Sequence, residues 1–144
     1  MTLNQISVFL ENRPGQLQTL TDALARRSIN MRALSLAETS EFGIVRIIVD
    51  DLAAASSALT EEGFIHTVTK VLGVAIPDEP GGLNRVLRIL SEGGINIEYM
   101  YAFLGTKDTR HAYMIFHVQN IYAAVGALAE KEITCISQDV LSNL

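Results

Sequence analysis

Hydrophobic and polar residues follow two alternating patterns in the first half of the chain. Over residues 5–10, Ile6, Val8 and Leu10 alternate with more polar positions, which predicts a strand. Over residues 14–27, apolar residues recur at helical spacing, which predicts a helix that begins at a proline. The same criteria predict strands at residues 31–39, 44–49 and 65–72 and a second helix at residues 52–62. The expected order is βαββαβ.

The second half repeats this order. Strands are expected at residues 73–76, 95–104, 111–118 and 135–140, and helices at residues 81–92 and 121–131. The pattern is typical of the split β-α-β motif, in which both helices cover one face of a four-stranded antiparallel sheet. We therefore expect an α+β fold of two tandem ferredoxin-like units, with domains at residues 1–72 and 73–144.

Two short motifs support the duplication. Glu-Asn-Arg-Pro-Gly-Gln-Leu at residues 11–17 reappears as Pro-Asp-Glu-Pro-Gly-Gly-Leu at residues 77–83. Ser-Ile-Asn-Met at residues 28–31 is echoed by Gly-Ile-Asn-Ile at residues 94–97. Both pairs are 66 residues apart, which indicates a repeated supersecondary unit.

Alternation in the second half also predicts which side chains share a sheet face. One face, turned to the helices, should carry Met100, Ala102, Met114, Phe116 and Val118. The other should be an exposed aromatic surface of Tyr99, Tyr101, Phe103, Tyr113, Ile115 and His117. Such a patch is typical of a contact surface, packed against another sheet of the chain or of a dimer. The alternative, a platform for stacking RNA bases, needs basic residues around it.

Charge and composition exclude several classes of function. The 144-residue chain carries a formal net charge of −5, which disfavours a nucleic-acid partner because basic faces supply most of that affinity. Its single cysteine, Cys135, cannot form an internal disulfide. No signal peptide or apolar run of about 20 residues is present, so we expect a cytoplasmic protein without a membrane partner.

The repeated turn between strand and helix carries the most informative chemistry. A helix that begins at Pro14 or Gly81 leaves its first backbone N–H groups unpaired, and these groups attract a carboxylate or phosphate. We expect Asn12 and Asn30 to reach the mouth of the same cleft, where amides suit a ligand with both an ammonium and a carboxylate. Alternatively, Asn12 and Asp78 only cap helices, and the later asparagines only make turns.

The turn motif, with the Ile-Asn-Met that follows the helix, resembles the ACT domain, a regulatory amino-acid-binding module. The likeness covers nearly the whole chain as two tandem copies. It implies allosteric binding of a small amino acid between paired ACT domains. The ligand-binding residues implied for the first copy are Asn12, Arg13, Pro14, Gly15, Gln16, Leu17, Asn30 and Met31. Those implied for the second are Asp78, Glu79, Gly81, Gly82, Leu83, Asn96 and Ile97.

Two departures from the family pattern favour the first copy. Some ligand-binding copies carry a polar residue two positions before the asparagine of the turn, where this chain has Leu10 and Ile76. Asp78 also replaces the amide in the second copy, and an ionised aspartate repels a ligand carboxylate.

No constellation of residues predicts catalysis. His111 and His117 lie roughly 20 Å apart on one strand, too far to share a metal ion. We therefore expect no catalytic residue, metal or cofactor. The function expected is that of an amino-acid sensor, as a homodimer formed through sheet faces or edges, that regulates a separate metabolic enzyme. The alternative is an oligomerisation module that assembles with such an enzyme without binding a ligand.

Overall fold

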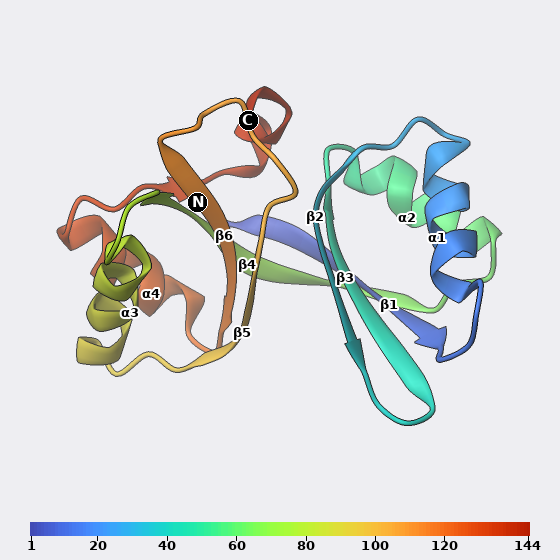
Figure 1. The fold of residues 1–144 in the computed structure, drawn as a ribbon, viewed down its shortest axis with the longest axis horizontal. Helices are drawn as coiled ribbons and strands as arrows, with labels where there is room; N and C mark the ends of the chain where they lie inside the picture. The colour runs from blue at the N-terminus through green and yellow to red at the C-terminus, as the bar shows by residue number, and fades with distance from the viewer. The chain divides into compact units, whose positions relative to one another are not determined.

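The computed structural model describes residues 1–144, which form two compact units (Figure 1). The first unit is Asn4–Thr69, and the second combines Met1–Leu3 with Lys70–Leu144. The domain boundaries expected above, residues 1–72 and 73–144, remain a proposal. No helix in the chain is long and apolar enough to cross a membrane.

The first unit is a four-stranded sheet covered on one face by two helices. Its elements are β1 (Leu3–Glu11), α1 (Gln16–Ala25), β2 (Met31–Glu38), β3 (Phe42–Val49), α2 (Leu52–Glu61) and the beginning of β4 (His66–Pro77). The strands lie in the order β2-β3-β1-β4, and β3 is antiparallel to both of its neighbours. Ile6, Val8 and Leu10 alternate along β1 into the core shared with α1 and α2.

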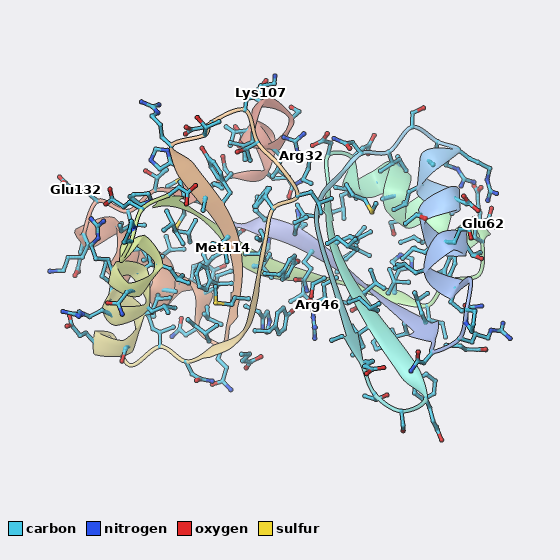
Figure 2. The ribbon with its side chains drawn as sticks, viewed as in Figure 1. Arg32, Arg46, Glu62, Lys107, Met114 and Glu132 are labelled. Atoms are coloured by element: carbon cyan, nitrogen blue, oxygen red, sulfur yellow. The ribbon has the colours of Figure 1, made fainter.

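The second unit has the same arrangement, with the rest of β4 as its first strand. Its other elements are α3 (Gly82–Glu92), β5 (Ile97–Ala102), β6 (His111–Val118), α4 (Ile121–Glu130), β7 (Cys135–Ile136) and a 3₁₀ helix (Gln138–Asn143). The strands lie in the order β5-β6-β4-β7. Met114 lies on the helix-covered face of β6, where it packs on the core around Val86 and Phe116 (Figure 2). The predicted fold class, two tandem βαββαβ units, is confirmed.

Some predicted element bounds are wrong. The two strands expected at residues 65–72 and 73–76 form one continuous strand, β4. The strand expected at residues 135–140 has only two residues, and a 3₁₀ helix that buries Leu141 follows it. The first helix of each unit begins later than expected, α1 at Gln16 and α3 at Gly82.

The expected aromatic surface exists, but it is not fully exposed. Tyr99 stacks on His117 with ring centroids 4.8 Å apart, and Phe103 meets Tyr113 edge to face at 6.0 Å. Tyr101 on the same face is only 9 % exposed, and Ile115 is fully buried. Of the residues expected on the helix face, Ala102 is exposed, whereas Met100, Met114, Phe116 and Val118 pack on the helix-side core.

Candidate functional site

A glycine with a left-handed backbone shapes the turn between β1 and α1. Gly15 has φ 86°, a conformation that costs a residue with a side chain about 1–2 kcal/mol, so the helix begins one residue later at Gln16. The N–H of Gln16 donates to the Arg13 carbonyl at 3.4 Å. The N–H groups of Leu17 and Gln18 donate to no protein acceptor. The start of α1 therefore offers two free donors at the positive end of the helix dipole.

A cavity of about 350 Å³ lies beside this turn. Residues of the turn, of α1 and of three strands line it: Leu10, Glu11, Asn12, Arg13, Gln16, Leu17, Leu36, Glu38 and Gly43. The register places Leu10 opposite Gly43 and Gly43 opposite Glu38, so the three form a row across β1, β3 and β2. A Cβ at Gly43 would lie 3.3 Å from Leu36 Cδ1. The side chain of Leu36 therefore already covers Gly43, at the centre of this row.

Polar side chains form the rim of the cavity. The Asn12 amide nitrogen donates to the Glu38 carboxylate at 3.2 Å and to the Thr39 carbonyl at 3.4 Å. The Arg13 guanidinium pairs with the Glu11 carboxylate at 3.0 Å. With its side-chain amide oriented so that the oxygen faces Arg13, Gln16 also accepts hydrogen bonds from the Arg13 guanidinium at 3.0 Å. The arrangement presents donors at the turn and a carboxylate, Glu38, at the end of β2.

Four of the eight residues predicted for the first site line this cavity, namely Asn12, Arg13, Gln16 and Leu17. Pro14 and Gly15 complete the turn before α1. The sequence analysis did not identify Leu36, Glu38 or Gly43 as site residues. Gly43 reaches the cavity because β3 pairs with β1, and Leu36 and Glu38 reach it because β2 pairs with β3. No local motif marks these three residues.

Asn30 and Met31 lie at the other end of the sheet. Met31 pairs with Val49 at the start of β2, whereas Glu38 pairs with Gly43 at its end. Seven residues of strand separate the two ends, roughly 23 Å at 3.3 Å per residue. Figure 2 labels Arg32, next to Met31, at the end of β2 opposite the β2–β3 hairpin. The expectation that Asn12 and Asn30 share one cleft within a unit is therefore wrong.

The corresponding turn of the second unit has the same backbone with different side chains. Gly81 has φ 84°, and the Asp78 N–H donates to the Arg110 carbonyl as the Asn12 N–H does to Glu41. A Cβ at Gly82 would lie 2.2 Å from the Pro77 carbonyl oxygen, so only glycine fits there.

The other residues predicted for the second site are dispersed. Glu79 pairs with Arg85, and Leu83 is partly exposed on α3. Gly81 lines a hollow together with Arg85 and Arg88, whereas Asn96 and Ile97 line a separate one at the start of β5. The second unit therefore does not gather its predicted residues around one cavity.

The strongest electrostatic perturbation lies in the loop between β5 and β6. The Asp108 carboxylate accepts from the backbone N–H of Arg110 at 2.9 Å, from His111 at 2.6 Å and from the Tyr113 hydroxyl at 3.1 Å. These bonds lower the pKa of Asp108 from 3.8 to about 2. Partial burial, followed by the bond to Asp108, raises the pKa of Tyr113. No group of three or more histidine, cysteine or acidic side chains is placed to hold a metal ion.

Solved structures similar to this chain include one near relative and several distant ones. Protein BT0572 from Bacteroides thetaiotaomicron is 38 % identical, with a TM-score of 0.92 over 100 % of this chain and 98 % of that one. The ligand-free regulatory subunit of aspartate kinase from Thermus thermophilus is 17 % identical, with a TM-score of 0.63 over 90 % of this chain and 91 % of that one. The regulatory subunit from Thermus flavus is 18 % identical, with a TM-score of 0.58 over 90 % and 92 %. No curated protein sequence matches the chain.

The family comparison agrees with the duplicated turn, the strand order and the helix-covered sheets described above. The family model of the ACT domain pair matches residues 1–144. The near relative, at 38 % identity over the full chain, has the same fold. The protein therefore belongs to the family of ACT domain pairs.

Proposed function

We propose that this protein is a regulatory sensor that binds a small amino acid in the cavity beside the turn between β1 and α1. One observation carries the proposal: Gln16 and Leu17 line the cavity at the helix start, where the N–H of Leu17 and that of the next residue, Gln18, lack a protein acceptor. A ligand carboxylate placed there gains two hydrogen bonds and a favourable interaction with the helix dipole. Arg13, on the same rim, carries a positive charge that is paired with Glu11.

The second unit contributes less to binding in this proposal. Its turn replaces Arg13 with Glu79 and Asn12 with Asp78, both of which repel a carboxylate. We therefore expect one amino acid per chain, bound by the first unit. Asp78, Glu79, Gly81, Gly82 and Leu83 then serve mainly to shape the second turn.

A homodimer gives Asn30 a role in this proposal. Asn30 lies at the opposite end of β2 from the cavity, so it contacts the ligand only if a second copy of the chain brings it there. Ligand binding would then change how copies pair, and through that the activity of a separate metabolic enzyme. Such a signal requires that the ligand bind one packing arrangement more tightly than the other.

Thermal unfolding in the presence of each free amino acid tests the proposal. A ligand with a Kd of about 10 μM, supplied at about 1 mM, stabilises the folded state by about 2.7 kcal/mol and raises the Tm by several degrees. Titration calorimetry of the amino acid that responds should give one site per chain. The absence of a response to every amino acid would overturn the proposal and favour an assembly module without a ligand.

A pair of matched substitutions locates the site. Gly43→Val adds a branched side chain to the cavity lining, against Leu36, and should abolish the response. Ala112, opposite Ile76 on β6, occupies the corresponding position in the second unit. Ala112→Val should therefore leave the response intact. Equal loss in both variants would place the ligand elsewhere.

A further inference from the structure

We propose that the cavity selects an amino acid with an aliphatic side chain, and that Glu38 accepts the ligand's α-ammonium. This inference rests on the function proposed above and adds the chemical class of the ligand. It depends on two features of the cavity: three leucines and one carboxylate.

The leucines form the apolar part of the lining. Leu10, on β1, is 4 % exposed, and Leu17 is half-buried on α1. Leu36, on β2, is 55 % exposed although it lies on the helix-covered face. An exposed leucine that lines a cavity gains when an apolar group covers it, because each buried methylene removes apolar surface from water. An aliphatic ligand side chain supplies that group.

Glu38 has unused hydrogen-bonding capacity and, unlike Glu11, is not paired with an arginine. Its Oε2 accepts from the Asn12 amide at 3.2 Å, whereas a carboxylate offers about four acceptor sites. Asn12 belongs to the turn that leads to the free N–H groups of α1. The bond between Asn12 and Glu38 therefore holds the acceptor for an ammonium close to the donors for a carboxylate. The N–H groups of α1 thus suit the negative charge of a zwitterion, and Glu38 suits its positive charge.

The remaining charges disfavour other ligand classes. An acidic side chain would meet Glu11 and Glu38, both of which line the cavity. A basic side chain would have to compete with Arg13 for Glu11, since these two already form an ion pair. A hydroxyl placed against the leucines would lose its hydrogen bonds to water. These costs leave an aliphatic side chain as the best fit.

Titration calorimetry with a series of free amino acids tests the selectivity. L-leucine, L-isoleucine, L-valine or L-methionine should bind most tightly, and L-alanine at least about a hundredfold more weakly than the best of them, because a single methylene in an apolar pocket changes affinity about tenfold or more. Tighter binding of L-threonine, L-lysine or L-glutamate would overturn the inference and leave the proposed function intact. No binding by any amino acid would instead overturn the proposed function itself.

Glu38→Gln tests the role of the carboxylate. The variant should bind L-leucine about tenfold or more weakly, because a hydrogen bond to a charged group is lost. It should bind N-acetyl-L-leucine, which has no ammonium, as the wild type does. Equal weakening of both probes would assign Glu38 a structural role and overturn this part of the inference. Glu41→Gln, in the neighbouring hairpin and outside the cavity lining, is the matched control and should bind L-leucine normally.

Discussion

The two turns of this molecule have the same backbone and different chemistry. Gly15 and Gly81 have φ values of 86° and 84°, and each precedes a helix that packs on its own sheet. In the first unit a side chain, Gln16, follows the glycine and lines a cavity. In the second unit Gly82 follows instead, and its backbone lies against the Pro77 carbonyl. Duplication has kept the residues that form the turn, whereas those that would contact a ligand differ.

The same contrast extends to the facing strands. The row Leu10, Gly43 and Glu38 has no side chain at its central residue and ends in a carboxylate. The corresponding residues of the second unit are Ile76 and Ala112, with Leu104 just beyond the end of β5. A methyl group takes the place of the glycine hydrogen, and a leucine takes the place of the charged residue. Small differences at three positions therefore distinguish the two turns.

The largest effect should come from a side chain placed in the second turn. Gly82→Ala brings a Cβ to 2.2 Å from the Pro77 carbonyl oxygen, a backbone atom that cannot move freely, and should lower the free energy of unfolding by about 3 kcal/mol. Gln16→Ala, at the corresponding position, should change it by less than about 0.5 kcal/mol. Urea unfolding of both variants measures the difference. Similar small effects would show that the two turns are packed alike, contrary to the comparison.

A smaller effect is expected at the C-terminal ends of α2 and α4, the second helix of each unit. Gly63 follows α2 with φ 79°, whereas Glu132 follows α4 with φ 58°. Both conformations are left-handed, so Gly63→Ala should destabilise the protein by about 1 kcal/mol. Glu132→Gly relieves the same strain but increases the freedom of the unfolded chain, and should stabilise the protein by about 0.5 kcal/mol. Thermal unfolding measures both, and a loss of stability in Glu132→Gly would contradict the expectation.

The smallest effect concerns the loop between β5 and β6, which has no counterpart of the same length in the first unit. The folded state lowers the pKa of Asp108 from 3.8 to about 2, so the ionised carboxylate stabilises the fold above pH 3.8. This contribution is lost as the pH falls through about 2. Asp108→Asn should lower the urea midpoint near neutral pH, and the gap to the wild type should close as the pH approaches about 2. A gap that is independent of pH would exclude the linkage.

Much of the architecture could be predicted from periodicity alone. The alternation of Ile6, Val8 and Leu10 predicts a strand and its buried face, and both hold in β1. Element ends were less predictable. The helix was expected to begin at Pro14, but the left-handed conformation of Gly15 delays it to Gln16. The last strand was expected to reach residue 140, but burial of Leu141 favours a 3₁₀ helix.

The residues of the candidate site likewise divide into those that the sequence predicts and those that it does not. The turn motif predicted Asn12, Arg13, Gln16 and Leu17 as site residues, since a strand-to-helix turn and its free N–H groups are local features, and all four line the cavity. Whether they bind a ligand remains a prediction. Nothing in the local sequence marks Gly43 or Glu38. Only the register of the sheet aligns these two residues with Leu10.

The sequence by itself thus determined the elements, their order and their duplication, because these depend on interactions between residues close in the chain and on the contrast between apolar and polar positions. The tertiary structure alone decided which side chains surround the cavity and separated Asn30 from Asn12. Strand pairing brings together residues that are distant in sequence, and a shift of one residue in register would turn a different set toward the helices.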